Sequence, residues 1–238
     1  MQDVFGKIME DALSGFEDEY EIERDDGYTT KGSVKQYSAP IQDWFSCERN
    51  AIKLARGKVL DIGCGAGRVL QYLKKIGIEG TGIDNSPSAI EACKKRGLQN
   101  VSLMSAAEMD YPKNTFDTIV LFGNNFGILG ETHKIVKMLK DIYRISTDNA
   151  IILACSRNPE STDNEAHIKY HQKNREQNLP PGYVTIRIRY KEAIGDWFSL
   201  LMVDEKDMEL IANQAGWTIK RKFDGEAGLY VGVLEKRV

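Results

Sequence analysis

The stretch that decides the fold reads K-V-L-D-I-G-C-G-A-G-R and runs from Lys58 to Arg68. Its short apolar run over residues 59–62, which Asp61 interrupts near its end, is typical of a strand inside a parallel sheet. Three glycines follow, alternating with small residues, before the apolar spacing changes to that of a helix over residues 69–76. Such a glycine loop lets the backbone approach a ligand closely and aims the free amides of the helix N-terminus at it. The sequence therefore predicts a binding loop, either for the pyrophosphate of a dinucleotide or for a nucleoside with an amino-acid tail.

The spacing of the glycines and the acid beside them separate these two ligands. The dinucleotide fingerprint is G-x-G-x-x-G, and Gly67 comes one position too early for it. A carboxylate just before the loop, that of Asp61, suits a cationic partner better than a diphosphate. The run V-L-D-I-G-C-G-A-G-R resembles the first motif of the class I S-adenosylmethionine-dependent methyltransferases, in which the acid and the glycines hold the methionine end of the cofactor. A glycine-rich turn in an unrelated α/β protein is the alternative.

A second acid follows the next expected strand. Residues 80–84 form a short strand that ends in Asp84, about 20 residues beyond the glycine loop. A carboxylate at this edge of the sheet can accept hydrogen bonds from both ribose hydroxyls, and the resemblance implies the same role. The alternative is that Asp84 caps the helix that begins at Ser86 and Pro87, although Ser86 suits that position better.

The third strand, over residues 101–104, leads into a turn where related enzymes often hold the adenine amino group with an acid followed by alanine. This chain has Ser105 in place of the acid. The adenine contact can then fall to the Ser105 hydroxyl, to the amides of Ala106 and Ala107, or to Glu108, and the sequence does not choose among them.

The fourth strand, over residues 116–122, ends in the loop G-N-N-F-G, residues 123–127. Ligands of open α/β sheets lie beyond the carboxyl ends of the strands, so this loop faces the reaction. Methyltransferases of exocyclic base nitrogens tend to carry two prolines here, and this chain has neither. The loop suits contacts to the methionine moiety and to a small acceptor, while a turn that uses asparagine and glycine for backbone reasons is the alternative.

The resemblance thus implies S-adenosyl-L-methionine as cofactor and S-adenosyl-L-homocysteine as product. The predicted cofactor-binding residues are Asp61, Gly63, Cys64, Gly65, Gly67, Asp84, Asn85, Ser105, Ala106, Ala107, Glu108, Gly123 and Asn124.

The N-terminal part precedes the first strand of the sheet. An amphipathic helix up to about residue 18 is followed by a strongly acidic segment, residues 17–27, which we expect to be solvated and mobile. Residues 28–45 carry several aromatic side chains, and the family commonly closes a lid over the cofactor at this place. Tyr37 and Trp44 are therefore candidate substrate residues and Asp43 a candidate catalytic residue, with plain surface packing as the alternative.

Residues 157–203 depart from the minimal fold. His167 and His171 are four residues apart on an expected helix and share one face. They lack a third ligand, so we expect no metal, and either histidine is a candidate general base. A hairpin follows in which Arg187 and Arg189 share a face, either to contact an anionic substrate or as a solvated side. Arg157 and Asn125 complete the candidate substrate residues, since both follow strand ends.

Strands that alternate with helices along the chain predict an α/β fold. By resemblance it is Rossmann-like and doubly wound, with a mostly parallel seven-stranded sheet, a C-terminal antiparallel hairpin and a lid or insertion on the substrate side. We divide the chain into residues 1–46 (N-terminal helix and lid segment), 47–156 (cofactor-binding core), 157–203 (substrate-side insertion) and 204–238 (final helix and closing hairpin).

Composition restricts the partners. The net charge of −3 and the pI near 5.8 argue against a polyanionic substrate, since nucleic-acid binders need a basic field. Four scattered cysteines without C-x-x-C spacing indicate reduced thiols in a cytoplasm. No apolar run approaches the ~20 residues of a membrane span, and the N-terminus is not that of a signal peptide.

The sequence therefore predicts a cytoplasmic methyltransferase of a small molecule. Methyl transfer is an in-line displacement, so the enzyme has mainly to hold donor and acceptor aligned and dry, and needs a base only for a protonated acceptor. An RNA or protein methyltransferase and a non-catalytic cofactor-binding regulator are the alternatives. The acceptor and its attacking atom stay open, as does the choice between monomer and homodimer.

Overall fold

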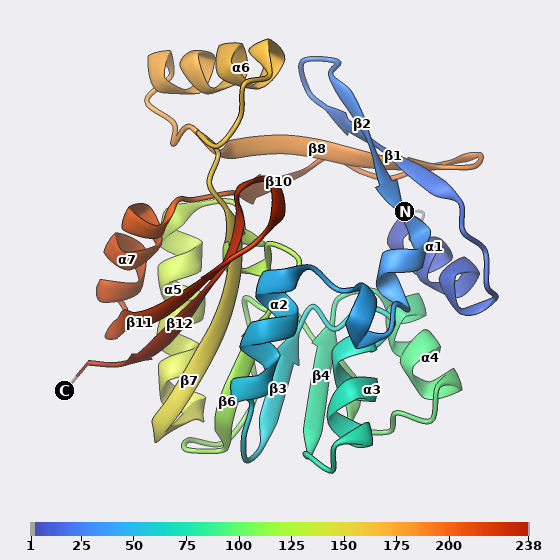
Figure 1. The fold of residues 1–238 in the computed structure, drawn as a ribbon, viewed down its shortest axis with the longest axis vertical. Coiled ribbons are helices and arrows are strands. Elements are labelled where there is room, and N and C mark those ends of the chain that lie inside the picture. The colour runs from blue at the N-terminus through green and yellow to red at the C-terminus, as the bar shows by residue number, and fades with distance from the viewer. Residues whose placement is uncertain (1–2, 238) are drawn as a thin grey trace.

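The computed structural model describes residues 3–237, which form two sheets with helices around them (Figure 1). The larger sheet has seven strands in the order β11-β12-β7-β6-β3-β4-β5. Its strands are β3 (Val59–Ile62), β4 (Gly80–Asp84), β5 (Val101–Leu103), β6 (Phe116–Leu121), β7 (Ser146–Arg157), β11 (Trp217–Asp224) and β12 (Leu229–Lys236). The first five are parallel to one another, and β12 and β11 close the sheet as an antiparallel pair. The predicted Rossmann-like fold is confirmed.

Helices cover both faces of this sheet because its strands are apolar on both sides. Leu60 and Ile62 of β3 face the cluster that contains α5 and α7, whereas Val59 faces the cluster that contains α2, α3 and α4. The helices are α2 (Ser46–Ala51), α3 (Arg68–Lys75), α4 (Pro87–Lys95), α5 (Thr132–Ile145) and α7 (Glu205–Asn213). Successive strand residues alternate between faces, so Asp61 lies on the side of Val59, towards α2 and α3.

The second sheet has the path β10-β8-β1-β2, with β9 paired to β8, and all its pairs are antiparallel. Its strands are β1 (Glu19–Arg24), β2 (Thr29–Ser33), β8 (Tyr183–Tyr190), β9 (Ala193–Ile194) and β10 (Phe198–Leu201). In Figure 1 it lies across the top of the molecule, above the seven-stranded sheet, with α6 (Glu165–Glu176) above β8. The lid segment before the core and the insertion after it therefore build one sheet together.

The acids of residues 17–27 are solvated as expected, since all but Glu23 are exposed, but the segment has regular structure. Most of that segment is β1, whose sequence E-Y-E-I-E-R alternates charged and apolar residues. Tyr20 and Ile22 pack in an apolar cluster with α1 (Val4–Leu13), while Glu21 and Glu23 lie opposite Arg189 and Arg187 of β8. The many charged residues of this segment obscure its alternation of charged and apolar positions. The arginines that pair with Glu23 lie far away in the sequence.

Glu23 shows how the charges of the second sheet are paired. Its carboxylate accepts two hydrogen bonds from Arg187, at 2.8 and 2.9 Å, and a third from Arg189. These bonds lower the pKa of Glu23 to about 2. Both arginines that the sequence offers for a substrate anion thus have a partner inside the chain, and their contact with a substrate stays a prediction.

The low pKa of Glu23 makes the second sheet sensitive to acid. A lowered pKa stabilises the folded state above the ordinary pKa of glutamate, and this contribution is lost as the pH falls from about 4.5 towards 2. We expect Glu23→Gln to lower the melting temperature by a few degrees at pH 7. The difference in melting temperature between the variant and wild type should shrink between pH 5 and pH 3. Thermal unfolding at several pH values measures this. Glu19→Gln, on the same strand in an exposed pair with Lys31, is the matched control and should change little. A difference in melting temperature that does not change with pH would show that the ionised Glu23 carboxylate does not stabilise the sheet.

Candidate functional site

The glycine loop joins β3 to α3 through three residues in left-handed conformation. The φ angles are +73° at Gly63, +54° at Gly65 and +75° at Gly67. A side chain would be strained at these angles, and at Gly67 its Cβ would lie 2.4 Å from a methyl carbon of Leu98. The loop therefore requires glycine for backbone conformation and for packing, and it turns the chain sharply at the carboxyl end of β3.

Asp84, the last residue of β4, links this loop to the end of that strand by a hydrogen bond. Its Oδ2 accepts a hydrogen bond from the Gly65 amide at 2.9 Å, and its Oδ1 accepts one from the Ser86 amide at 2.9 Å. Ser86 is the cap of α4, because its hydroxyl accepts a hydrogen bond from the Ala89 amide. Burial raises the pKa of Asp84. The helix-cap role therefore belongs to Ser86, and Asp84 brings the tips of β3 and β4 together.

Asp61 has a buried oxygen without a partner. Its side chain lies in β3 with 3% exposed, and no group of the described residues donates a hydrogen bond to its Oδ2. Burial raises its pKa to about 7, an effect that the charge of Arg68 opposes and the charges of Asp84 and Glu48 reinforce. Buried carboxylates normally have partners. An acceptor of this kind beside a binding loop fits the donor of a ligand, such as an ammonium group.

Asn124 supplies a second acceptor of this kind at the tip of β6, the neighbour of β3. Its Oδ1 is likewise buried without a partner in the described part of the chain, and its backbone is left-handed with φ +67°. Asn125 is already engaged, because its amide nitrogen donates to the Ile62 carbonyl at 2.9 Å. Of these two asparagines, Asn124 is the one whose side-chain oxygen is buried without a partner.

An ion pair that the sequence did not reveal lies under the loop. Arg68, the first residue of α3, donates from Nη2 to Oε2 of Glu48 at 2.7 Å. Its guanidinium carbon also lies 4.8 Å from the ring of Trp44. Trp44 is 4% exposed, so the structure places this candidate substrate residue against Arg68 and not at a surface. No local pattern in the sequence marks this pair, because Glu48 and Arg68 lie on different helices, 20 residues apart in the chain.

Helix α1 lies on the glycine loop from the other side. Asp3 caps α1 and accepts a hydrogen bond from the Ser86 hydroxyl at 2.6 Å, which ties the helix to α4. A Cβ at Gly65 would lie 3.4 Å from Met9 and 3.7 Å from the ring of Tyr37. The lid segment thus brings Tyr37 directly to the loop, as one expects of a residue that contacts a ligand there.

The third strand tip offers an apolar surface. Leu103 of β5 pairs with Asp84 across the sheet and is 58% exposed. An exposed leucine beside the proposed ribose acid is a flat apolar contact of the kind that a purine covers, and sequence reasoning missed it. Ser105 and Glu108 follow it and are exposed, and the Ser105 hydroxyl accepts a hydrogen bond from the Ala107 amide at 3.2 Å. The structure does not choose among the candidates for the adenine contact.

The remaining cofactor candidates surround the loop. Cys64 is buried between the loop and Gly82, and Cys93 donates to the Gly65 carbonyl at 3.2 Å. Asn85 is exposed just after β4. Gly123 donates its amide to Glu48 at 2.9 Å.

Other candidates lie elsewhere. The two histidines are on α6, where His167 packs against the ring of Tyr28 at 5.0 Å and His171 is 6% exposed. Burial lowers the pKa of both. Arg157 donates to the Ala227 carbonyl in the turn before β12, and Asp43 is exposed at the end of a short helix. The role of each stays a prediction. Within residues 3–237 no three metal-ligating side chains come together.

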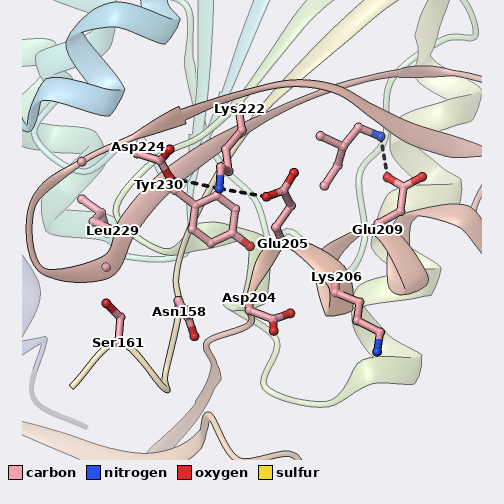
Figure 2. A pocket seen from close by; sticks show the side chains of 13 residues that line it. Asn158, Ser161, Asp204, Glu205, Lys206, Glu209, Lys222, Asp224, Leu229 and Tyr230 are labelled. Atoms are coloured by element: carbon pink, nitrogen blue, oxygen red, sulfur yellow. Dashed lines mark hydrogen bonds and ion pairs between the residues drawn. The ribbon is translucent and has the colours of Figure 1, made fainter. Parts of the chain in front are cut away.

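A cavity of about 720 Å³ lies apart from these residues, between α7, the end of β7 and the β11–β12 hairpin (Figure 2). Its polar side chains pair with one another, since Lys222 bonds to both Glu205 and Asp224, and Glu209 accepts the Ile219 amide. None of the predicted cofactor residues lines it. We therefore place the functional site at the glycine loop and not in this cavity.

Residues 59–149 match the family model described as "Methyltransferase domain". Over this range, which is less than half of the chain, the sequence resembles methyltransferase domains. The matched range contains the glycine loop, Asp84 and the tips of β5 and β6. In the part of the chain that the structure describes, no helix is long and apolar enough to span a bilayer.

Relatives and solved structures resemble this chain at low identity. A ubiquinone biosynthesis O-methyltransferase of Xanthomonas oryzae pv. oryzae is 24% identical over 106 residues, which are 44% of this chain and 40% of the relative. This chain therefore spans less than half the length of the curated relatives it matches. An S-adenosylmethionine-dependent methyltransferase of Bacteroides fragilis, solved in complex with S-adenosyl-L-homocysteine, superposes with a TM-score of 0.83 at 23% identity, over 99% of this chain and 95% of that one. The CcbJ methyltransferase of Streptomyces caelestis superposes with a TM-score of 0.61 at 15% identity, over 85% of this chain and 98% of that one. These structures show the fold, and the first covers the second sheet as well.

The unpartnered oxygen of Asp61 leads to a stability prediction. With its pKa raised to about 7, the folded protein binds more protons than the unfolded chain between about pH 4 and pH 7, so the free energy of unfolding falls as the pH rises through this range. We expect Asp61→Asn to be more stable than wild type at pH 8 without ligand, by about 1–4 kcal/mol, and the difference to shrink at pH 5. Urea unfolding at both pH values measures it, with the exposed Asp163→Asn as control. A variant less stable than wild type at pH 8 would show that Asp61 is satisfied within the free protein.

Proposed function

We propose that this protein is an S-adenosyl-L-methionine-dependent methyltransferase that methylates a small molecule. The observation that carries the proposal is the buried, unpartnered carboxylate oxygen of Asp61 beside a left-handed glycine loop, with a second acid, Asp84, on the adjacent strand tip. These groups fit the donor from its amino-acid tail to its ribose. The methyltransferase-domain match over residues 59–149 supports the same reading.

The amino-acid tail is a zwitterion, and the site has a charge for each of its ends. Asp61 accepts the ammonium group, which supplies the donor that its Oδ2 lacks. Arg68 binds the carboxylate, since Glu48 occupies its Nη2 and a guanidinium has five N–H donors. Burial in a site of low dielectric strengthens both contacts relative to the same contacts in water.

The adenosyl part lies along the next two strand tips. Each carboxylate oxygen has two lone pairs, so Asp84 can accept the ribose hydroxyls while it keeps the amides of Gly65 and Ser86. The adenine ring then covers Leu103, and the turn from Ser105 to Glu108 contacts its edge. No other part of the described chain combines two acids with such a loop.

The bound cofactor supplies a methyl group on a positively charged sulfur, ready for displacement by a nucleophile. The chain's own residues bind, orient and exclude water. Met9 and Tyr37 cover the loop, and α1 is tied to α4 through Asp3 and Ser86, so the lid segment closes the site from solvent. Alignment of two reactants in this way lowers the activation barrier by roughly 7–11 kcal/mol. An acceptor that reacts unprotonated needs no dedicated base.

A small acceptor agrees with the acidic surface and with this closed lid. The net charge of −3 gives no general attraction for nucleic acid. The curated relatives include a ubiquinone biosynthesis O-methyltransferase, which methylates oxygen on a small molecule. We infer from these features a small acceptor in a soluble, cytoplasmic enzyme, and leave its attacking atom unassigned.

Calorimetry with S-adenosyl-L-homocysteine tests the cofactor site. We expect micromolar binding to wild type and a dissociation constant about 10–100 times larger for Asp84→Asn, because the charge-assisted bonds to ribose are weakened. Arg187→Ala and Arg189→Ala are controls that should bind normally, since each leaves Glu23 with the other arginine. Unchanged affinity in Asp84→Asn would remove the ribose role, and no binding to wild type would refute the cofactor assignment.

A label-transfer experiment tests the acceptor class. With methyl-labelled cofactor and a cell extract separated by size, we expect label only in the small-molecule fraction. Label in RNA or in protein would identify a macromolecular acceptor. Cofactor binding without any transfer to the three fractions would indicate a regulator and not an enzyme.

A further inference from the structure

Glu48 is a buried carboxylate that belongs to no sequence motif. None of its side chain is exposed, and it lies on α2 in an apolar environment that includes Cys47, Ala51 and Cys155. Burial raises the pKa of the Cys47 and Cys155 thiols, and the charge of Glu48 adds to this rise. A charge in such surroundings is costly unless it is paired and hydrogen-bonded, so its partners are informative.

Each oxygen of Glu48 has one partner, and the two partners come from neighbouring strand ends. Oε2 accepts from Arg68, which directly follows the glycine loop after β3. Oε1 accepts from the amide of Gly123, at 2.9 Å, just after β6. The strands β3 and β6 are adjacent in the sheet. One buried side chain therefore joins the two strand tips that carry Asp61 and Asn124, each of which has a buried side-chain oxygen without a partner.

Arg68 is held from two directions as a result. Glu48 takes Nη2 at 2.7 Å, and the Trp44 ring lies against the guanidinium at 4.8 Å. An ion pair combined with an aromatic contact fixes the plane of a guanidinium and leaves its remaining donors facing one way. Burial raises the pKa of Asp61 and of Tyr37, and the charge of Arg68 opposes this rise in both, so both groups at the loop lie within its field.

We propose that Glu48 is a positioning residue of the methyl-donor site, which orients Arg68 to bind the carboxylate of the donor's amino-acid tail. This inference rests on the proposed function. Glu48 acts through Arg68 and, by way of the Gly123 amide, on the loop that carries Asn124. Its role is to preorganise the pocket for the tail.

Two ligands separate this role from a purely structural one. S-adenosyl-L-homocysteine carries the amino-acid tail, whereas 5′-methylthioadenosine has the same adenosyl thioether without it. A carboxylate that only stabilises the fold affects both ligands alike. A carboxylate that acts through Arg68 affects only the ligand with a carboxylate to bind.

The test is binding of both ligands to wild type and to Glu48→Gln, by calorimetry or ligand-observed NMR. The amide has the same shape, but it places an N–H donor opposite either Arg68 or the Gly123 amide. We expect the dissociation constant of S-adenosyl-L-homocysteine to rise about tenfold and that of 5′-methylthioadenosine to stay within about twofold. Glu160→Gln, which makes the same change in the exposed pair with Arg175, is the matched control and should alter neither constant.

Equal weakening of both ligands, or no weakening of either, overturns the inference. Thermal unfolding of each variant establishes that it is folded. Should Glu48→Gln fail to fold, the double variant Glu48→Gln/Arg68→Gln removes both buried charges, and it should bind S-adenosyl-L-homocysteine as well as Arg68→Gln alone does. Weaker binding by the double variant would show a role of Glu48 independent of Arg68. Wild type that binds neither ligand refutes the proposed function itself, which is a different result.

Discussion

The left-handed backbone of the glycine loop is the constraint on which the rest of the site depends. Positive φ angles at Gly63, Gly65 and Gly67 turn the chain within a few residues from a buried strand into α3. The turn exposes backbone amides at the carboxyl edge of the sheet, and one of them donates to Asp84 on the next strand. Because β3 to β7 are parallel, their carboxyl ends all lie at this same edge. A residue with a side chain in the loop would strain the turn and separate the acids that meet around it.

The buried charged side chains around the glycine loop are only partly neutralised or hydrogen-bonded within the protein. Glu48 and Arg68 neutralise each other, while Asp84 is satisfied by two backbone amides. Asp61 keeps an oxygen without a partner, and its raised pKa is the electrostatic cost of that arrangement. Proteins retain such costs where a ligand removes them. The free protein is thus less stable than its core alone would allow, and under the proposed function the ammonium group of the methyl donor would supply the partner that Asp61 lacks.

In the second sheet, by contrast, charged side chains pair with one another. A run of acids before the core and a pair of arginines in a distant insertion neutralise each other across β1 and β8, with Glu23 between Arg187 and Arg189. The inner side of this sheet packs α1, and α1 in turn places Met9 beside the glycine loop. The cover of the site is therefore built from two chain segments that fold together, and the approach to the donor depends on their pairing.

The sequence by itself determined the glycine loop, both acids of the strand tips and the alternation of strands with helices, because these follow from local periodicity and from glycine's backbone freedom, while the seven-stranded sheet was implied by the resemblance to class I methyltransferases. Tertiary structure alone decided the rest. It paired β1 with β8, and it set Glu48 against Arg68 and buried Trp44 beside them. It also exposed Leu103 next to Asp84 and took the α6 histidines away from the loop's contacts. Each of these depends on contacts between residues far apart in the chain, and a charged residue in a sequence carries no mark of whether water or a distant partner will neutralise it.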